Sequence, residues 1–497
     1  MSVTGIDLLL AEQADLTAVG RFSRAHDAAL PNAREPSYRA LIPFEKPGKG
    51  EQYAFEVNLD QCTGCKACVA ACHSLNGLEE EETWREVGLL LGGTAKSPRQ
   101  QTVTSACHHC EDPGCLEGCP VLAYEKDGET GIVRHLDDQC IGCQYCILKC
   151  PYEVPKYSEK LGIVRKCDMC HSRLAADEAP ACVQACPTSA ISIRIISSPE
   201  IRRNAESGFF LPDSPDSRLT KPSTTYTSAR PLSERALAAD HHRPNVQHAH
   251  WPLVFMLVLT QAGVGLLTGG LFPGARPFAV VAGTLLIQFG LAVSVMHLGQ
   301  PLKAWRAFLG WRTSWLSREI IVLGALGPLS AAAAAAGFFE PTRPWQPLLV
   351  LVSATTGWLG VLCSAWVYHD TGRMVWRGPL SFGRFFLTGA IFAALAAEEI
   401  PAFFALAGFK LVIGMALVVR GATKSLRLDD LDRSARLLRG PLRPWVAIRF
   451  VAGGAALLLV ADGHQAGGGL IFLVSELLER ALFFLAGIGK KMPGQPP

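Results

Sequence analysis

Cysteine is almost absent from this sequence outside one segment. Of the 17 cysteines, only Cys363 lies outside the stretch from Cys62 to Cys186. A secretory leader is also missing, because acidic residues interrupt the short apolar run Leu8–Leu10, and no twin-arginine pair lies near Met1. We therefore expect no export signal. Disulfides need an oxidising compartment, so this expectation argues against disulfides as the reason for the clustered cysteines.

The common catalytic signatures are missing as well. The sequence shows no nucleophile–base pair, no phosphate loop and no dinucleotide fingerprint beside its cysteines. Its net charge of +3 is too small to indicate a nucleic-acid partner. We therefore expect no catalytic residue in this chain and no binding of nucleic acid. A separate catalytic partner is expected instead.

Charge and apolarity divide the chain into parts. It is polar up to about residue 244 and overwhelmingly apolar from 251 to about 489. Residues 201–248 are rich in Pro, Ser, Thr and Arg, a composition that we do not expect to bury a core. An amphipathic helix is expected over 6–22. The predicted parts are an amino-terminal arm (1–50), a cysteine-rich domain (51–200), a linker (201–248), a membrane anchor (249–490) and a tail (491–497).

The clustered cysteines form four groups of four. The groups are Cys62, Cys65, Cys68 and Cys72; Cys107, Cys110, Cys115 and Cys119; Cys140, Cys143, Cys146 and Cys150; and Cys167, Cys170, Cys182 and Cys186. Groups one and three keep the spacing Cys-x2-Cys-x2-Cys-x3-Cys, in which three thiolates of one loop hold irons of one cubane and the fourth reaches a second cluster. Groups two and four stretch one gap, and groups two to four each end on Cys-Pro.

Iron–sulfur clusters account for this pattern better than zinc does. Paired Cys-x2-Cys motifs also build four-thiolate zinc sites, but zinc does not account for the third closely spaced cysteine or for the repeated Cys-Pro. We therefore predict four [4Fe-4S] clusters that form an electron relay. His108 and His109 lie inside group two, and we expect them to support the site or the fold.

Short alternating segments flank the cysteine groups. These segments, which are typical of strands, cover residues 53–59, 131–136, 162–166 and 191–195. Strand, cysteine loop, short helix and strand thus recur along the domain. The repetition predicts an α+β fold in which two ferredoxin-like modules, each with two [4Fe-4S] clusters, are duplicated or interleaved.

The apolar half contains eight candidate membrane spans. They cover residues 251–270, 278–297, 319–338, 346–366, 383–397, 401–419, 445–461 and 468–488. Most approach the ~20 residues that a helix needs to cross a bilayer. The fifth is the shortest. We predict that the carboxyl-terminal half is an all-α bundle of eight transmembrane helices surrounded by membrane lipid.

Basic residues concentrate in alternate connectors of this half. The connectors after the second, fourth and sixth spans carry four, three and seven Lys or Arg residues, whereas the opposite connectors carry only Arg276 and Arg343. Short loops rich in Lys and Arg stay in the cytoplasm. We therefore predict a multi-pass protein of the cytoplasmic (inner) membrane, with the iron–sulfur domain on the cytoplasmic side.

Ionisable residues inside the spans are candidate functional groups, because a charge at mid-bilayer costs roughly 3 kcal/mol. His297 ends the second span and Glu319 begins the third, directly after Arg318. A quinone needs a proton-exchanging group and a hydrogen-bond donor, and a His with a carboxylate supplies both. The alternative is that His297 is an interfacial cap and Glu319 pairs with Arg318. Further candidates, which can also pair with one another, are Lys410, Arg449, Glu476, Glu479 and Arg480.

Together these motifs resemble two subunits of one family. Residues 51–200, with Cys-Ile-Gly-Cys-Gln-Tyr-Cys and Cys-Pro-Tyr in group three, resemble the four-cluster iron–sulfur subunit of the dimethyl sulfoxide reductase family of molybdoenzymes. Residues 249–490 resemble the membrane anchor of the same family. His250-Trp-Pro-Leu, Met296-His297-Leu-Gly-Gln-Pro and Leu316-Ser-Arg-Glu319-Ile carry that match. The chain therefore looks like a fusion of the two subunits.

The resemblance implies cofactors, partners and ligand sets. It implies a separate catalytic subunit with a molybdopterin cofactor, and a menaquinone or ubiquinone site at His297 and Glu319, with Arg318 beside them. It also implies that each cluster takes three cysteines from one group and one from another. By resemblance, the first three cysteines of group one share a cluster with Cys186, those of group four with Cys72, those of group two with Cys150, and those of group three with Cys119.

The direction of electron flow stays open. The best-known members of the family work outside the cytoplasmic membrane, whereas the charges here predict an iron–sulfur domain inside. The fusion and this orientation are similar to cytoplasm-facing sulfite-oxidising relatives, in which electrons flow from substrate to quinone. We therefore expect an electron relay between quinone and the catalytic subunit in either direction. A redox-coupled ion-moving module and a purely structural anchor are the alternatives.

Overall fold

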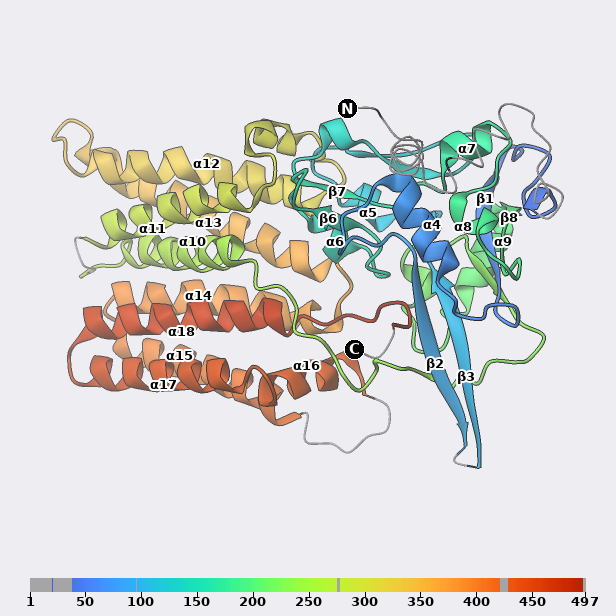
Figure 1. Ribbon diagram of the computed structural model, residues 1–497. Helices are drawn as coiled ribbons and strands as arrows, with labels where there is room; N and C mark the ends of the chain where they lie inside the picture. Colours follow the sequence, from blue (N-terminus) through green and yellow to red (C-terminus); the bar gives the residue numbers. More distant parts are fainter. Residues whose placement is uncertain (1–19, 21–37, 95, 275–277, 421–427, 495–497) are drawn as a thin grey trace, which may run out of the picture.

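The structure is a computed structural model with two parts, an iron–sulfur region and a bundle of long helices, which lie side by side in Figure 1. It describes residues 20, 38–94, 96–274, 278–420 and 428–494. The helix expected over residues 6–22 lies outside the described residues, apart from residue 20. The amino-terminal arm is therefore seen only from residue 38 onward, where Tyr38 and Ile42 are buried in the core of the iron–sulfur region.

A three-stranded sheet closes one side of the iron–sulfur region. Strands β1 (Glu51–Asn58) and β8 (Ile191–Ser197) pair antiparallel, and the short β9 (Thr225–Thr227) pairs parallel with the other edge of β1. Phe55 and Val57 of β1 are buried, and so are residues 52–54, because β1 is the central strand and both of its faces are covered there. The strands predicted at 53–59 and 191–195 are confirmed.

Two small hairpins carry the other predicted strands. Strands β4 (Tyr124–Lys126) and β5 (Val133–His135) form one, and β6 (Lys156–Ser158) and β7 (Ile163–Arg165) form the other. Both hairpins precede a cysteine group, so the strands predicted at 131–136 and 162–166 are confirmed. The cysteine loops lead into short helical segments. These are α4 (Ala67–Asn76), α5 (Gly114–Glu117), η1 (Asp137–Gln139), α6 (Tyr145–Lys149), α7 (His171–Ala175) and α8 (Ala181–Gln184).

A long hairpin extends away from the body of the iron–sulfur region (Figure 1). It is formed by β2 (Glu86–Thr94) and β3 (Ser97–Ser105), and the two-residue β10 (Leu237–Ala238) pairs with β2 near its base. Val87, Leu90 and Val103 near the base are buried, whereas the far end is exposed. The base of the hairpin therefore belongs to the core that surrounds the cysteines.

The linker expected over 201–248 is packed onto the iron–sulfur region along most of its length. Helix α9 (Ser198–Glu206) buries Ile201, and η2 (Ser217–Leu219), β9 and β10 follow. Buried hydroxyl groups bond to the body of the region; for example, Ser223 Oγ donates to the carbonyl oxygen of His108 over 2.8 Å. The expectation of a segment without a core is therefore wrong for this part. A polar composition did not prevent burial, because these hydroxyls find hydrogen-bond partners.

The carboxyl-terminal half is a helical bundle. Its helices are α10 (Trp251–Gly269), α11 (Ala279–Ser294), α12 (Trp315–Ala336), α13 (Gln346–His369), α14 (Pro379–Ala396), α15 (Ile400–Arg420), α16 (Asp430–Arg439), α17 (Arg443–Ala461) and α18 (Gln465–Leu485). Two 3-10 helices, η3 (Val295–His297) and η4 (Pro301–Phe308), lie in the connector before α12, while η5 (Arg343–Trp345) and η6 (Met374–Trp376) precede α13 and α14.

Seven of these helices are long and apolar enough to cross a membrane, counted over the described residues. They are α10 to α15 and α17. The eighth expected span, α18, is as long as α15 but carries Glu476, Glu479 and Arg480. Helix α10 is the most buried of the seven, and α15 and α17 are the least buried. The fifth span was expected to be the shortest, and this expectation is wrong, because α14 has 18 residues and α11 has 16.

The iron–sulfur region sits on one end of the bundle. Gln300 Nε2 donates to the carbonyl oxygen of Leu161 over 2.8 Å, and Lys149 Nζ lies 2.6 Å from a carboxylate oxygen of Asp370. Gly299 lies against Gly162 so closely that a Cβ at position 299 would collide with the carbonyl oxygen of Gly162. The two parts are therefore in direct contact through backbone as well as side chains.

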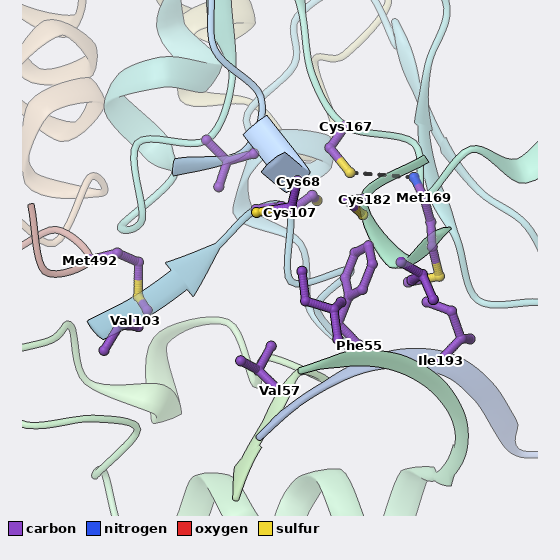
Figure 2. Close-up of a cluster of buried hydrophobic side chains, with 14 of the residues drawn as sticks. Phe55, Val57, Cys68, Val103, Cys107, Cys167, Met169, Cys182, Ile193 and Met492 are labelled. Atoms are coloured by element: carbon purple, nitrogen blue, oxygen red, sulfur yellow. Dashed lines mark hydrogen bonds between the residues drawn. The ribbon is translucent and has the colours of Figure 1, made fainter. Parts of the chain in front are cut away.

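The end of the chain returns to the iron–sulfur region. Met492 is buried in the core that contains Phe55 and Val103, and Figure 2 shows it beside Val103. The carbonyl oxygen of Gly494 accepts from the amide of Leu89 over 3.2 Å. The expected tail (491–497) is therefore part of the packed structure as far as residue 494, the last residue described.

Candidate functional site

Two cavities in the iron–sulfur region are each lined by cysteines from two different groups. One cavity is lined by Cys62, Cys65, Cys68 and Cys186. A second is lined by Cys107, Cys110, Cys115 and Cys150. In both cases three cysteines come from one group and the fourth from another. This is the crosswise sharing that the resemblance implied.

The remaining cysteines lie together in the same crosswise manner. Burial, and after it the charge of Cys119, raises the pKa of Cys143. Burial, and after it the charge of Cys182, raises the pKa of Cys72 to about 12. Cys119 thus lies among the first three cysteines of group three, and Cys72 lies beside group four.

Backbone amides point at several of the sulfur atoms. The amide of Gly142 lies 3.3 Å from Cys140 Sγ, and the amide of Met169 lies 3.4 Å from Cys167 Sγ, as Figure 2 shows. Donors of this kind stabilise a thiolate and tune a cluster's potential. Among the described residues no three His, Cys, Asp or Glu side chains converge as a single metal ion requires. Four cysteines around one space are the ligand set that a [4Fe-4S] cluster takes, and such a cluster would supply one-electron transfer when bound.

Two buried cations lie among the cysteines. Arg85 is only 2% exposed, its guanidinium lies 4.6 Å from the ring centroid of Phe55, and its Nε and Nη2 have no hydrogen-bond partner among the described residues. Lys166 is buried, with Nζ 3.6 Å from Cys107 Sγ. Both face groups that carry negative charge as thiolates. They therefore act on the cysteines electrostatically, and no sequence motif had indicated them.

The two histidines of group two are buried and neutral. Burial, and after it the charge of Arg85, lowers the pKa of His108 to about 3. His108 Nδ1 lies 3.0 Å from Thr224 Oγ1, and His109 Nδ1 accepts from the amide of Val133 over 3.1 Å. These bonds join the group-two loop to two other segments, in keeping with the expected supporting role.

A cavity of about 270 Å³ lies where the iron–sulfur region meets the bundle. Most of its lining is apolar, from α10, α11, α12 and α13, as in pockets that bind small organic molecules. Its outer wall is the group-three loop with Cys143 and Tyr145. Its polar groups include His250, His297 and Glu319. The structure thus brings His297 and Glu319 together, as predicted, and places a cysteine of group three in the same cavity.

The polar groups of this cavity are held by specific partners. His297 Nε2 lies 3.2 Å from the carbonyl oxygen of Cys143. The ring of His250 meets that of His297 edge to face, with centroids 5.2 Å apart. Burial, and after it the charge of His297, lowers the pKa of His250 to about 3. The hydroxyl of Ser364 donates a hydrogen bond to Glu319.

Arg318 does not join His297 and Glu319. Its Nε donates to the carbonyl oxygen of Trp311 over 3.0 Å, and its guanidinium lies 4.4 Å from the ring centroid of Trp315. Successive residues of a helix point in different directions, so Glu319 faces the cavity while Arg318 faces outward. The expected role of Arg318 in the quinone site is therefore not supported by its position, and neither is the alternative of a Glu319–Arg318 pair.

His250 in the cavity and Ser364, which bonds to Glu319 from α13, are polar residues that the sequence analysis did not assign to the site. His250 was noted only as part of a motif, and its φ of 49° turns the chain into α10 beside His297. Ser364 lies in α13, 45 positions from its partner Glu319. A histidine immediately before an apolar span was a signal that could have been used. Nothing local in the sequence indicates Ser364.

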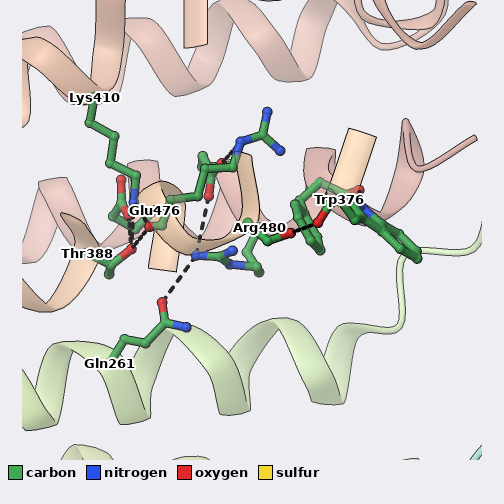
Figure 3. Close-up of polar contacts among 10 residues, drawn as sticks. Gln261, Trp376, Thr388, Lys410, Glu476 and Arg480 are labelled. Carbon is green, nitrogen blue, oxygen red and sulfur yellow. Dashed lines mark hydrogen bonds and ion pairs between the residues drawn. The ribbon is translucent and has the colours of Figure 1, made fainter. Parts of the chain in front are cut away.

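The ionisable residues deeper in the bundle form a connected network, shown in Figure 3. Lys410 and Thr388 both bond to the carboxylate of Glu476. Arg480 Nη2 donates to Gln261 Oε1 over 3.1 Å. Lys410 and Glu476 therefore pair with each other, which is the alternative left open for the candidates inside the spans.

The second carboxylate of the network is shared. Glu479 lies 3.4 Å from Arg384 Nε and 3.6 Å from Arg480 Nη2. Glu479 and Arg480 thus also pair with each other, with Arg384 as a third member. Arg449 lies nearby and is not part of these pairs.

The cysteine spaces define an iron–sulfur electron-transfer protein, and the apolar helices join it to a membrane anchor. A family model for a 4Fe-4S dicluster domain matches residues 99–195, and one for the DMSO reductase anchor subunit (DmsC) matches residues 245–425. The B subunit of the anaerobic dimethyl sulfoxide reductase of Escherichia coli (strain K12) is 36% identical over 179 residues, which are 34% of this sequence and 86% of that protein.

Two further relatives carry other names. The thiosulfate reductase electron transfer subunit PhsB of Salmonella typhi is 37% identical over 155 residues, 31% of this sequence and 80% of that protein. The hydrogenase-2 operon protein HybA of Escherichia coli O157:H7 is 36% identical over 156 residues, 26% of this sequence and 48% of that protein. This protein belongs to the dimethyl sulfoxide reductase family, as a fusion of its iron–sulfur subunit with its membrane anchor.

Proposed function

We propose that this protein relays electrons between a membrane quinone pool and a separate molybdopterin-containing catalytic subunit. One observation carries the proposal. A single apolar cavity is lined both by Cys143 of the third cysteine group and by His297 and Glu319 of the bundle. A quinone ring in this cavity would lie directly beside a cluster ligand, so electrons need no further carrier to enter or leave the iron–sulfur region.

Four [4Fe-4S] clusters would form the relay, each with three cysteines of one group and one of another. The supporting observation is the grouping of the thiols, with Cys186 beside the first group and Cys150 beside the second. The cluster at Cys140, Cys143, Cys146 and Cys119 adjoins the membrane cavity. Cys65 of the first group is exposed, and it offers the relay a surface for a partner protein.

His297 and Glu319 would exchange the protons of the quinone reaction. Oxidation of a quinol to a quinone releases two protons and two electrons, and reduction takes up the same. A neutral His297 imidazole and the Glu319 carboxylate, which both line the cavity, can each take up one proton. Ser364, which donates to Glu319, would position that carboxylate. The same groups serve either direction of electron flow, and the direction follows from the cluster and quinone potentials.

We place the iron–sulfur region on the cytoplasmic side of the inner membrane. The connectors that carry most Lys and Arg residues are those that touch the iron–sulfur region. Lys303 Nζ, for instance, donates to the carbonyl oxygen of Asp138 over 3.0 Å, and Arg373 Nη2 lies 3.5 Å from Glu153. Retention of basic loops in the cytoplasm supports this orientation. The eighth span would be α18, whose charges face partners inside the bundle.

Substitution of the two cavity residues tests the proposal. His297→Gln and Glu319→Gln, assembled with the catalytic partner, should each lower quinol-linked turnover by about 100-fold or more, the usual contribution of a general acid or base. Turnover driven by a dye that reduces the catalytic subunit directly should not change. Arg318→Gln is the matched control, because that side chain lies outside the cavity, and it should retain quinol-linked turnover. Unchanged quinol-linked turnover in both cavity variants would contradict the assignment.

A further inference from the structure

One buried cation in the bundle, Arg449, forms no ion pair with any described residue, and the nearest carboxylate across its cavity, Glu479, is paired with other arginines. Arg449 lies in α17, within the first two turns after Arg443, and is 6% exposed. Its guanidinium forms no hydrogen bond or ion pair with any described residue, and its Nε is among the buried atoms without a partner. Its aromatic contact is Phe450, with the ring centroid 5.0 Å away. Burying a guanidinium without an anion is costly, so this position favours a bound anion.

Arg449 faces a small cavity rather than packed side chains. The cavity holds about 40 Å³ and is also lined by Arg384, Ser434 and Glu479. Glu479 is already shared by two other cations, at 3.4 and 3.6 Å. The cavity therefore offers two guanidinium groups, a hydroxyl-bearing residue and the Glu479 carboxylate, whose Oε2 has no hydrogen-bond partner among the described residues. It has room for one compact group, and its arginines favour an anionic one.

The buried charges around this cavity do not balance within the described part of the bundle. The cations of the network are Arg384, Lys410, Arg449 and Arg480, and its carboxylates are Glu476 and Glu479. Four positive groups thus face two negative ones. The connector at this end of the bundle adds further basic residues, among them Arg436 and Arg439. Basic pockets between helices on such a face attract phosphate-bearing lipid head groups.

The backbone fixes the guanidinium at the cavity. Gly414 of α15 lies flat against it, and a Cβ at that position would approach Arg449 Nη1 to 2.5 Å. Helices α15 and α17, which hold these two residues, are the least buried of the seven apolar helices. The cavity therefore adjoins the part of the bundle that is most open to lipid.

We propose that Arg449, together with Arg384, binds a phosphate group at this cavity. The phosphate group belongs either to the head group of an anionic phospholipid or to free inorganic phosphate. Bidentate guanidinium–phosphate pairing would give Arg449 the ion pair that no described residue provides. The bound phosphate would tie α15 and α17 to α14, and in the case of a phospholipid it would join the bundle to the surrounding membrane. This site is distinct from the quinone cavity and does not depend on the proposed electron relay.

The test is binding to the full-length protein in detergent, measured by native mass spectrometry and by thermal stabilisation. The probes are phosphatidylglycerol, phosphatidylcholine and inorganic phosphate. Arg449→Gln should weaken binding of the phosphate-bearing probe by at least about tenfold, as loss of a charge-assisted hydrogen bond implies. Arg443→Gln is the matched control, since Arg443 is exposed on the same helix, and it should change binding much less.

The probes separate the two sources of phosphate. If the wild type retains phosphatidylglycerol selectively and Arg449→Gln does not, the site binds a lipid head group. If inorganic phosphate stabilises the wild type and not Arg449→Gln, the site binds a free anion. Equal binding by wild type and Arg449→Gln, or equal losses in both arginine variants, would overturn the site. Because Arg449→Gln could impair folding, Gly414→Ala serves as a second variant. It displaces the guanidinium without removing it and should also weaken binding, and the visible absorbance of the clusters reports whether each variant is folded.

Discussion

The imidazole Nε2 of His297 lies 3.2 Å from the carbonyl oxygen of Cys143. This contact joins η3, at the end of the second apolar helix, to the loop of the third cysteine group, which lies far away in the sequence. The cavity beside it is shared by both parts of the protein. A molecule that is reduced or oxidised in the cavity would therefore exchange electrons directly with the iron–sulfur region, because the cluster ligand Cys143 lines the same cavity.

The crosswise arrangement predicts which cysteine substitutions are equivalent. Cys65→Ser and Cys186→Ser should perturb the same cluster, because both side chains line one cavity. Electron paramagnetic resonance of the reduced protein should therefore lose or shift the same signal in both variants. Cys72→Ser should affect a different signal although it belongs to the same sequence group. Cys363→Ser, outside all four groups, is the control and should leave the spectrum unchanged. If Cys65→Ser and Cys72→Ser changed the same signal while Cys186→Ser changed a different one, this pairing would be contradicted.

Arg85 should raise the reduction potential of the clusters that it faces. Its buried positive charge favours the reduced, more negative form of a cluster, and the burial weakens solvent screening. Arg85→Leu should lower the midpoint potential of a nearby cluster, on the order of 100 mV by Coulomb's law at a protein's effective dielectric constant. Redox titration followed by electron paramagnetic resonance measures this shift. Arg99→Leu, at an exposed position of the long hairpin, should shift no potential, and an equal shift there would exclude a local effect of Arg85.

His250 should make the protein less stable in mild acid. Its pKa is about 3 in the folded protein and about 6.5 in an unfolded chain. Between these values the unfolded state binds more protons, so stability falls as pH falls from about 6.5 toward 3. His250→Gln removes this dependence, and from pH 7.5 to pH 5 the variant should lose less stability than the wild type, by on the order of 1 kcal/mol. Thermal denaturation in detergent at the two pH values measures the difference. Parallel losses in both proteins would show that His250 is not the titrating group.

Met492 should stabilise the iron–sulfur region although it lies at the end of the membrane half. It is 6% exposed in a core with Phe55 and Val103. Met492→Ala should cost about 2–5 kcal/mol, as for other large-to-small core changes, and should lower the temperature at which cluster absorbance is lost. Met296→Ala makes the same change at a side chain that is 76% exposed, and it should have little effect. No difference between the two variants would show that the tail contributes no packing energy.

Local patterns in the sequence were sufficient to predict the main strands and the cluster-binding cysteines. The alternating residues at 53–59 and 191–195 became β1 and β8. Burial alternates at the start of β8, as one covered face requires, whereas residues 52–55 of β1 are all buried. The cysteine spacing predicted iron–sulfur chemistry, because a cluster needs several thiolates within one tight loop. Composition was less reliable between residues 201 and 248, where hydroxyl groups such as Ser223 Oγ are buried with partners. Their partners lie about a hundred positions away, so no local pattern shows them.

By itself, the sequence determined which residues can bind clusters and which segments can cross a membrane, since spacing and periodicity are properties of neighbouring residues. Only the tertiary structure decided which cysteines share a space, that His250 lines the cavity with His297, and that Arg318 points away from Glu319. It also decided that Arg449 is buried without an ion pair to any described residue. These relationships depend on how helices rotate and pack against one another, and packing is set by contacts between segments that are far apart in the chain.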